Sequence, residues 1–121
     1  MTFIFVALGG GLGAAARYLL SLVPFRQTFP LMTLLTNITG ALAIGFISGL
    51  INRNEGLSRN TVLFWKTGVC GGFTTFSTFS LEACELIENK NYLAGGSYMV
   101  LSLVLCFGAV LAGKKLAALL G

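Results

Sequence analysis

The stretch of sequence that decides the fold is Gly68-Val69-Cys70-Gly71-Gly72-Phe73-Thr74-Thr75-Phe76-Ser77-Thr78-Phe79-Ser80. It lies inside an apolar segment, yet its three glycines and its run of serine and threonine make it a poor continuous α-helix. Non-helical backbone survives at membrane depth only where protein, water or an ion satisfies its freed polar groups. A helix broken here would mark a site, although a glycine-softened kink in an ordinary helix accounts for the same composition.

The composition around this stretch indicates a chain that has lipid as its solvent. Of 121 residues, 55% are hydrophobic and 10% are charged, and the mean hydropathy is +0.86. A soluble domain of this size needs a largely polar surface, which so few charged side chains cannot supply. Apolar stretches at about 2–23, 31–51, 61–82 and 92–120 each approach the length that crosses a hydrocarbon core. Because lipid excludes open strand edges, the predicted fold is an all-α membrane protein of four transmembrane helices in one domain, residues 1–121.

Short polar connections separate the four stretches, at Pro24–Pro30, Asn52–Asn60 and Glu82–Asn91. An even number of spans places both termini and the middle connection on the same side of the membrane. The basic residues of that side are Arg53, Arg59, Lys66, Lys114 and Lys115, and those of the other side are Arg17, Arg26 and Lys90. This weak excess favours cytoplasmic termini, and so weak a bias leaves room for chains inserted in both orientations.

Small residues recur at the spacing that lets membrane helices approach closely. The pairs are Gly9 with Gly13, Gly45 with Gly49, and Gly108 with Ala112. We expect these three pairs to lie at helix interfaces.

The composition also argues against several classes of function. The sequence has no histidine, and so no imidazole for metal binding, no aspartate, and no pair of carboxylates predicted at a convergent depth, so an enzyme is the least expected class. The basic residues are scattered, which argues against a nucleic-acid surface. The three cysteines, Cys70, Cys84 and Cys106, are odd in number and are predicted to be small buried residues without disulfides.

Polar side chains occur inside two of the other apolar stretches. Asn37 lies mid-span in Thr36-Asn37-Ile38-Thr39-Gly40, where a buried amide must be satisfied or functional. It offers donors to an ion, or it forms an interhelical hydrogen bond. Tyr98, Ser102 and Cys106 share one face of the fourth span and form a possible polar track, unless their hydroxyls only bond to their own helix.

Three motifs together carry a resemblance to a known family. They are Gly-x-Gly-Ala-x-x-Arg-Tyr at 11–18, Asn-x-x-Gly at 37–40, and Gly-Gly-x-Thr-Thr-Phe-Ser-Thr-Phe at 71–79. Through them the chain resembles, over almost its whole length, the small bacterial fluoride channels called Fluc or CrcB. The resemblance implies a fluoride-selective channel in the cell inner (plasma) membrane that exports fluoride down its electrochemical gradient.

The resemblance further implies an antiparallel, dual-topology dimer with two pores and a structural sodium ion at its centre. The sodium ligands would be the backbone carbonyls of Gly71 and Thr74. The residues expected to line the fluoride pore are Asn37, Phe76, Phe79, Thr78, Tyr98 and Ser102. Arg17 matches a vestibular or structural arginine, and Glu82 matches an acidic residue near the pore end. Cys106 departs from the family pattern, because a hydroxyl is expected there. Whether the chain pairs with itself or with a homologous partner stays open.

Two other kinds of membrane protein fit part of this pattern. A small multidrug-type proton antiporter also has four short helices, but it needs a titratable carboxylate inside the membrane. Glu82 is the only candidate, and it sits at the end of a span. A non-transporting assembly subunit would leave the broken third span and Asn37 unexplained.

Overall fold

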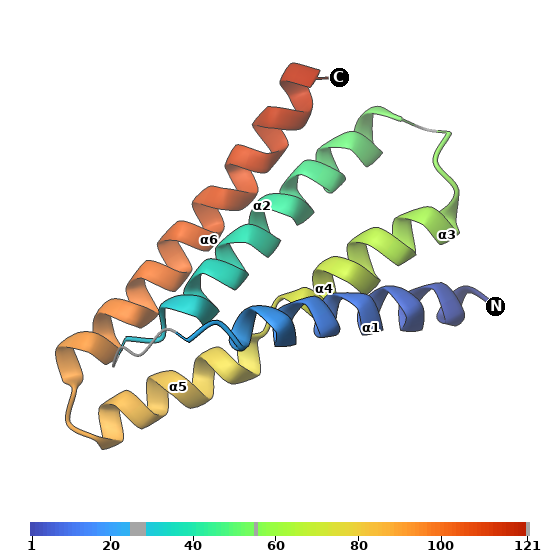
Figure 1. Cartoon of the computed structure of the whole chain (residues 1–121). Coiled ribbons are helices and arrows are strands. Elements are labelled where there is room, and N and C mark those ends of the chain that lie inside the picture. Colours follow the sequence, from blue (N-terminus) through green and yellow to red (C-terminus); the bar gives the residue numbers. More distant parts are fainter. Residues whose placement is uncertain (25–28, 55, 121) are drawn as a thin grey trace.

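The chain is all-helical wherever the computed structural model describes it, which is residues 1–24, 29–54 and 56–120 (Figure 1). No strand occurs in those three ranges. In chain order the helices are α1 (Thr2–Ser21), α2 (Leu31–Arg53), α3 (Arg59–Val62), η1 (Leu63–Cys70), α4 (Gly71–Phe73), α5 (Phe76–Glu88) and α6 (Tyr92–Leu120). All are α-helices except η1, which is a π-helix. The all-α fold class predicted from the sequence is therefore confirmed.

Three of these helices, α1, α2 and α6, are long and apolar enough to cross a membrane, among the residues described. They match the first, second and fourth apolar stretches of the sequence. The third stretch is divided among α3, η1, α4 and α5, and each of these is shorter than a single span. α3, η1 and α4 follow one another without a gap and pack along α1, whereas α5 runs on from them beside α2 and α6 (Figure 1).

Both ends of the described chain lie at one end of the bundle. The start of α1, the end of α2, the start of α3 and the end of α6 lie there, and the turn between α5 and α6 lies at the other end (Figure 1). This arrangement agrees with four passes through the same layer. Most of the predicted first connection, including Arg26, lies outside the described residues. The charge bias that sets the orientation stays a prediction.

The third predicted connection was placed too early in the sequence. Helix α5 continues through Glu82 and Glu85 to Glu88, and the turn before α6 holds only Asn89, Lys90 and Asn91. Glutamate is a good helix former, so a charged run at a membrane end need not end a helix. Lys90 follows the C-cap residue Asn89 and has a positive φ of 65°. A residue in this left-handed conformation commonly ends a helix.

Glycines allow the two closest helix pairs, α1 with η1 and α2 with α6. A Cβ at Gly9 would collide with the carbonyl oxygen of Phe64, and one at Gly13 with that of Val69. On the other pair, a Cβ at Gly45 would collide with the carbonyl oxygen of Val110. Gly49 also sits at this interface, with Ala117 within 2.6 Å of the position of an added Cβ. Two of the three small-residue pairs therefore lie at helix interfaces, as predicted.

The third small-residue pair meets no other helix among the described residues of this chain, so its place at an interface stays a prediction. No atom of the described residues lies within 4 Å of a Cβ built on Gly108, and Ala112 is exposed within the chain. The face that packs on α2 is instead marked by Ala109, Gly113 and Ala117, all of them buried. α6 carries small residues on adjacent faces, and spacing alone does not tell which face meets the neighbouring helix.

The three cysteines differ in their surroundings. All three are free thiols, and Cys70 is buried, Cys106 is half-buried and Cys84 is exposed on α5. The expectation of three buried cysteines was therefore wrong for Cys84, which lies on the outer face of α5.

Candidate functional site

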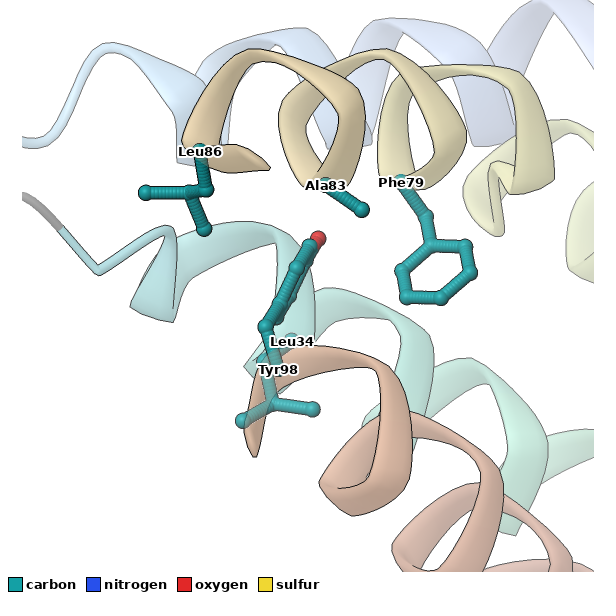
Figure 2. Packing of buried hydrophobic residues seen from close by; sticks show 5 residues of the cluster. All are labelled: Leu34, Phe79, Ala83, Leu86 and Tyr98. Atoms are coloured by element: carbon teal, nitrogen blue, oxygen red, sulfur yellow. The ribbon is translucent and has the colours of Figure 1, made fainter. Parts of the chain in front are cut away.

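A cluster of buried side chains fixes the position of α5 against α2 and α6. Tyr98 of α6 lies at its centre and is fully buried, with an exposed fraction of 0%. Its ring centroid lies 5.0 Å from that of Phe79, and the other members are Leu34, Ala83 and Leu86. Figure 2 shows the hydroxyl of Tyr98 directed toward α5 between Leu86 and Phe79. There it donates a hydrogen bond of 3.1 Å to Oε1 of Glu82, so a polar contact joins α5 to α6 within an apolar cluster.

The helical path is interrupted at two residues, Thr74 and Thr75. Both have extended backbones, with φ and ψ of −84° and 155° at Thr74 and of −147° and 112° at Thr75. The N–H and the hydroxyl of Thr74 both donate to the carbonyl oxygen of Cys70, at 3.1 and 2.9 Å. The hydroxyl of Thr75 accepts from the N–H of Thr78 at 3.1 Å and thereby caps α5. The threonines thus end one helix and begin the next.

The amide of Asn37 holds this interruption from α2. The N–H of Thr75 donates to Oδ1 of Asn37 at 2.8 Å, and Nδ2 of Asn37 donates to the carbonyl oxygen of Thr75 at 3.1 Å. The side chain therefore pairs with both polar groups of one backbone residue. This is the interhelical hydrogen bond that the sequence left open as one role for Asn37. Its amide carries a second N–H, for which no acceptor is found among the described residues.

Gly40 gives the interruption the space that it needs. A Cβ at Gly40 would collide with Cγ2 of Thr74 and would lie 3.2 Å from Cδ2 of Phe73. Positions 37 and 40 are three apart on α2 and therefore share a face. The Asn-x-x-Gly motif thus combines a side chain that binds Thr75 with a bare backbone that accommodates Thr74.

The carbonyl oxygens at the end of α4 have different partners. Nε of Arg17, on α1, donates to the carbonyl oxygen of Gly72 at 3.2 Å, and that of Cys70 is occupied by Thr74. No hydrogen bond to the carbonyl oxygen of Gly71 or Thr74 is found from any residue that the structure describes. These two are the carbonyls predicted to bind sodium, and that role stays a prediction.

An open groove of about 450 Å³ lies beside the interruption, between α2, α5 and α6. It brings together four of the predicted pore residues, Asn37, Phe76, Phe79 and Ser102. Thr74, which is half-buried, and the free thiols of Cys70 and Cys106 line the same groove. Phe76 is 76% exposed and Phe79 is 9% exposed, and their ring centroids are 5.6 Å apart. The groove is therefore lined by aromatic rings and a small number of polar groups.

The remaining predicted residues line two neighbouring spaces. Arg17 and Thr78 border a small cavity of about 60 Å³ that shares Thr75 with the groove. Glu82 borders a wider opening of about 370 Å³ at the far end of α5. Tyr98 contacts Phe79, which lines the groove, and Glu82, which borders the wider opening. The sequence-predicted residues therefore occupy three adjacent spaces along α5.

Two residues of the site were missed as individual candidates. Thr75 carries the backbone groups that Asn37 binds, and Gly40 leaves room for Thr74. Threonine is a favoured residue at helix N-caps, so Thr75 could have been identified from the sequence as the residue before a new helix. The pairing of Thr75 with Asn37 could not be inferred in this way, because the two residues are 38 positions apart.

The chain is a multi-pass helical membrane protein. It has several long apolar helices, and Asn37 of one of them is hydrogen-bonded to the interrupted third segment. The family model described as "CrcB-like protein, Camphor Resistance (CrcB)" matches residues 4–114. The chain belongs to this CrcB family, and the resemblance drawn from the three sequence motifs is confirmed.

Curated relatives match over nearly their whole length. The chain is 46% identical to fluoride-specific ion channel FluC 1 of Nitrobacter hamburgensis, with 98% of each chain covered. It is 43% identical to the fluoride-specific ion channel FluC of Clostridium perfringens, over 97% of this chain and 94% of the relative. The FluC of Flavobacterium psychrophilum is 40% identical, with 96% of each chain covered. The relatives are named as ion channels rather than enzymes, and the chain is a multi-pass protein of the inner membrane.

Proposed function

We propose that this chain is a fluoride-selective ion channel that lets fluoride leave the cell down its electrochemical gradient. The observation that carries the proposal is the groove beside Thr74 and Thr75, where an amide, a buried hydroxyl and two phenylalanine rings meet. The names of the relatives, which share 40% to 46% of their residues with this chain, point to the same ion.

The chemistry of the groove suits a small, strongly hydrated anion. A selective pore must replace the ion's water with close donors and yet release the ion. The second N–H of Asn37 and the hydroxyl of Ser102 supply donors. Aromatic rings carry a positive edge, so Phe76 and Phe79 offer weak contacts to an anion without the tight binding of a lysine. The groove-lining residues include no lysine or arginine, which agrees with rapid release.

The working unit in this proposal is an antiparallel dimer of dual topology, in which the interruption at Thr74 and Thr75 lies at mid-membrane. The groove is open on one side, and the exposed large side chains beside it, Phe76, Leu103 and Phe107, would be covered by a second subunit. Two symmetry-related grooves would then give two pores. The partner is either a second copy of this chain or a homologous chain of the opposite orientation.

A structural sodium ion belongs to the same proposal. Its ligands would be the carbonyl oxygens of Gly71 and Thr74, which have free lone pairs at the end of a helical path. Two carbonyls from one chain make too small a shell, so a twofold axis must supply the same pair again. The ion would add positive potential near the two pores and hold the interrupted segments together.

The experiment that tests the function is anion efflux from liposomes that contain the purified chain alone. Fluoride efflux without chloride efflux is the expected result. Efflux of both anions at similar rates would contradict fluoride selectivity. Proton-coupled uptake of an organic cation, with no fluoride efflux, would replace the proposal with the small multidrug-type antiporter.

Substitution of the two phenylalanines should separate a pore role from a packing role. We expect Phe76→Leu and Phe79→Leu each to reduce fluoride efflux strongly, because each removes an aromatic edge from the groove. Only Phe79→Leu should also lower the free energy of unfolding, by about 1 kcal/mol, since Phe79 is buried against the ring of Tyr98. Efflux and chemical unfolding measure the two effects.

The matched controls for this pair are Phe5→Leu and Phe46→Leu, which lie outside the groove lining. Both controls should retain fluoride efflux. Equal losses of fluoride efflux at all four positions would mean that Phe76 and Phe79 act only in packing.

The sodium ion should affect assembly more than the fold of one subunit. Replacing sodium with a large organic cation is expected to weaken the dimer, because the facing carbonyls of Gly71 and Thr74 would then repel one another. Subunit exchange between differently labelled chains, followed by fluorescence transfer, measures this. Exchange rates that are the same in both cations would contradict the sodium site and leave the fluoride proposal to the efflux experiment.

A further inference from the structure

The wall that α6 contributes to the groove carries an unpaired hydroxyl beside a thiol. Ser102 is 7% exposed, and its Oγ has no hydrogen-bond partner among the residues that the structure describes. Cys106 follows four residues later on the same face, is a free thiol and lines the same groove. Buried polar groups are nearly always paired in folded proteins. The hydroxyl of Ser102 is therefore free for a ligand in the groove, which is fluoride in the proposed function and with which a second ligand would compete.

The chemistry of the two side chains selects a particular class of ligand. Within the described ranges, no group of three or more His, Cys, Asp or Glu side chains could hold a metal ion, which disfavours zinc and other ions that need several such ligands. A single thiol is a soft ligand and prefers soft metal ions. A monovalent ion on one thiolate forms a neutral pair, so it places no net charge in a groove with a mostly apolar lining.

We propose that Ser102 and Cys106 form a binding site for a soft monovalent metal ion, with Ag⁺ as the representative. Sγ of Cys106 is the ligand, and Oγ of Ser102 supplies a weaker oxygen contact. On binding, the S–H bond breaks, the sulfur–silver bond forms and the proton passes to water, without oxidation or reduction. Because the site lines the groove, a bound ion obstructs the path of fluoride, and this consequence rests on the proposed function.

The other two cysteines provide internal comparisons. Cys84 is exposed on α5 and is not among the residues that line the groove. Cys70 faces the groove from η1 but is 3% exposed. Each cysteine can therefore be kept alone while the other two are replaced, in the full chain and in the same membrane.

Binding is measured first, independently of ion flow. The probe is Ag⁺ from silver nitrate in a chloride-free buffer, and the readout is protection of a single cysteine from methyl methanethiosulfonate, followed by mass spectrometry. In a chain that keeps only Cys106, we expect Ag⁺ to protect the thiol, and Ser102→Ala to weaken this protection about tenfold by removing the oxygen contact. In a chain that keeps only Cys84, Ser102→Ala should change nothing. An unchanged protection of Cys106 in Ser102→Ala overturns the two-residue site.

Fluoride efflux is measured next, in nitrate solutions, because silver fluoride dissolves in water whereas silver chloride does not. Ag⁺ should block efflux through the unmodified chain and through Cys84→Ser, but not through Cys106→Ser, with each variant compared with itself before addition. A block that persists in Cys106→Ser and disappears in Cys70→Ala overturns the proposal. Protection of Cys106 in a chain that shows no fluoride efflux would support the metal site while contradicting the proposed function.

Discussion

Asn37→Leu is expected to abolish most fluoride efflux while leaving the helices folded. In the native chain Oδ1 of Asn37 accepts the N–H of Thr75, which would otherwise be free to donate to the carbonyl of Gly71 and continue the helix. Without the amide, Thr74 and Thr75 either become helical or leave the N–H and carbonyl of Thr75 unpaired. The second outcome costs about 1–3 kcal/mol for each buried group. A donor to fluoride is lost at the same time. Efflux from liposomes should fall by about tenfold or more, since about 1.4 kcal/mol corresponds to tenfold.

The control for Asn37 is Thr39→Val on the same helix. The hydroxyl of Thr39 bonds to its own helix at the carbonyl oxygen of Leu35 and is exposed, so valine should leave efflux and stability nearly unchanged. Circular dichroism checks that the helices persist in both variants. Full fluoride efflux in Asn37→Leu would remove this side chain from the pore and from the interruption that it holds.

Gly13→Val is expected to have the largest effect on folding. A Cβ at Gly13 would collide with the carbonyl oxygen of Val69 and would lie 2.7 Å from the backbone N of Phe73. Backbone cannot move aside as a flexible side chain can, so α1 must separate from η1 and α4. We expect the free energy of unfolding to fall by about 3 kcal/mol or more, at the upper end of overpacking costs. The fluorescence of Trp65, the only tryptophan, reports on η1 during unfolding.

Gly11→Val is the matched control, two residues earlier in the same helix. Within the part of the chain that the structure describes, no atom lies within 4 Å of a Cβ at Gly11, so this variant has the same change in helix propensity without the collision. Its unfolding midpoint should equal or slightly exceed that of the unmodified chain. Similar losses of stability in both variants would mean that the packing of α1 on η1 does not depend on Gly13.

The sequence predicted the features of the fold that depend on local composition. Apolar length gave α1, α2 and α6 almost to the residue, and the glycine and threonine content of the third stretch pointed to the segment where Thr74 and Thr75 are extended. The motifs then identified the family, which matches residues 4–114. Each of these inferences used residues that are close together in the chain.

The features that the sequence did not predict depend on contacts between distant residues. Spacing selected Gly108 and Ala112 as a packing pair, whereas Gly113 is the glycine of α6 that meets α2. The charged run from Glu82 was read as a connection, but the hydroxyl of Tyr98 bonds to Glu82 and the helix continues past it. Which face of α6 packs depends on the helix beside it, and the surroundings of Glu82 depend on Tyr98 of another helix. Neither can be read from one segment alone.

The two hydrogen bonds between Asn37 and Thr75 also bear on the order in which the chain is built into the membrane. Synthesis proceeds from the N-terminus, so α2 and its amide are present before Thr75 emerges. We expect the third segment to acquire its interruption as it docks on α2, before α6 has been made. Tyr98 arrives last and closes the cluster around Phe79. A chain stopped after residue 91 should therefore already contain the interruption, but not the buried cluster that fixes α5 behind it.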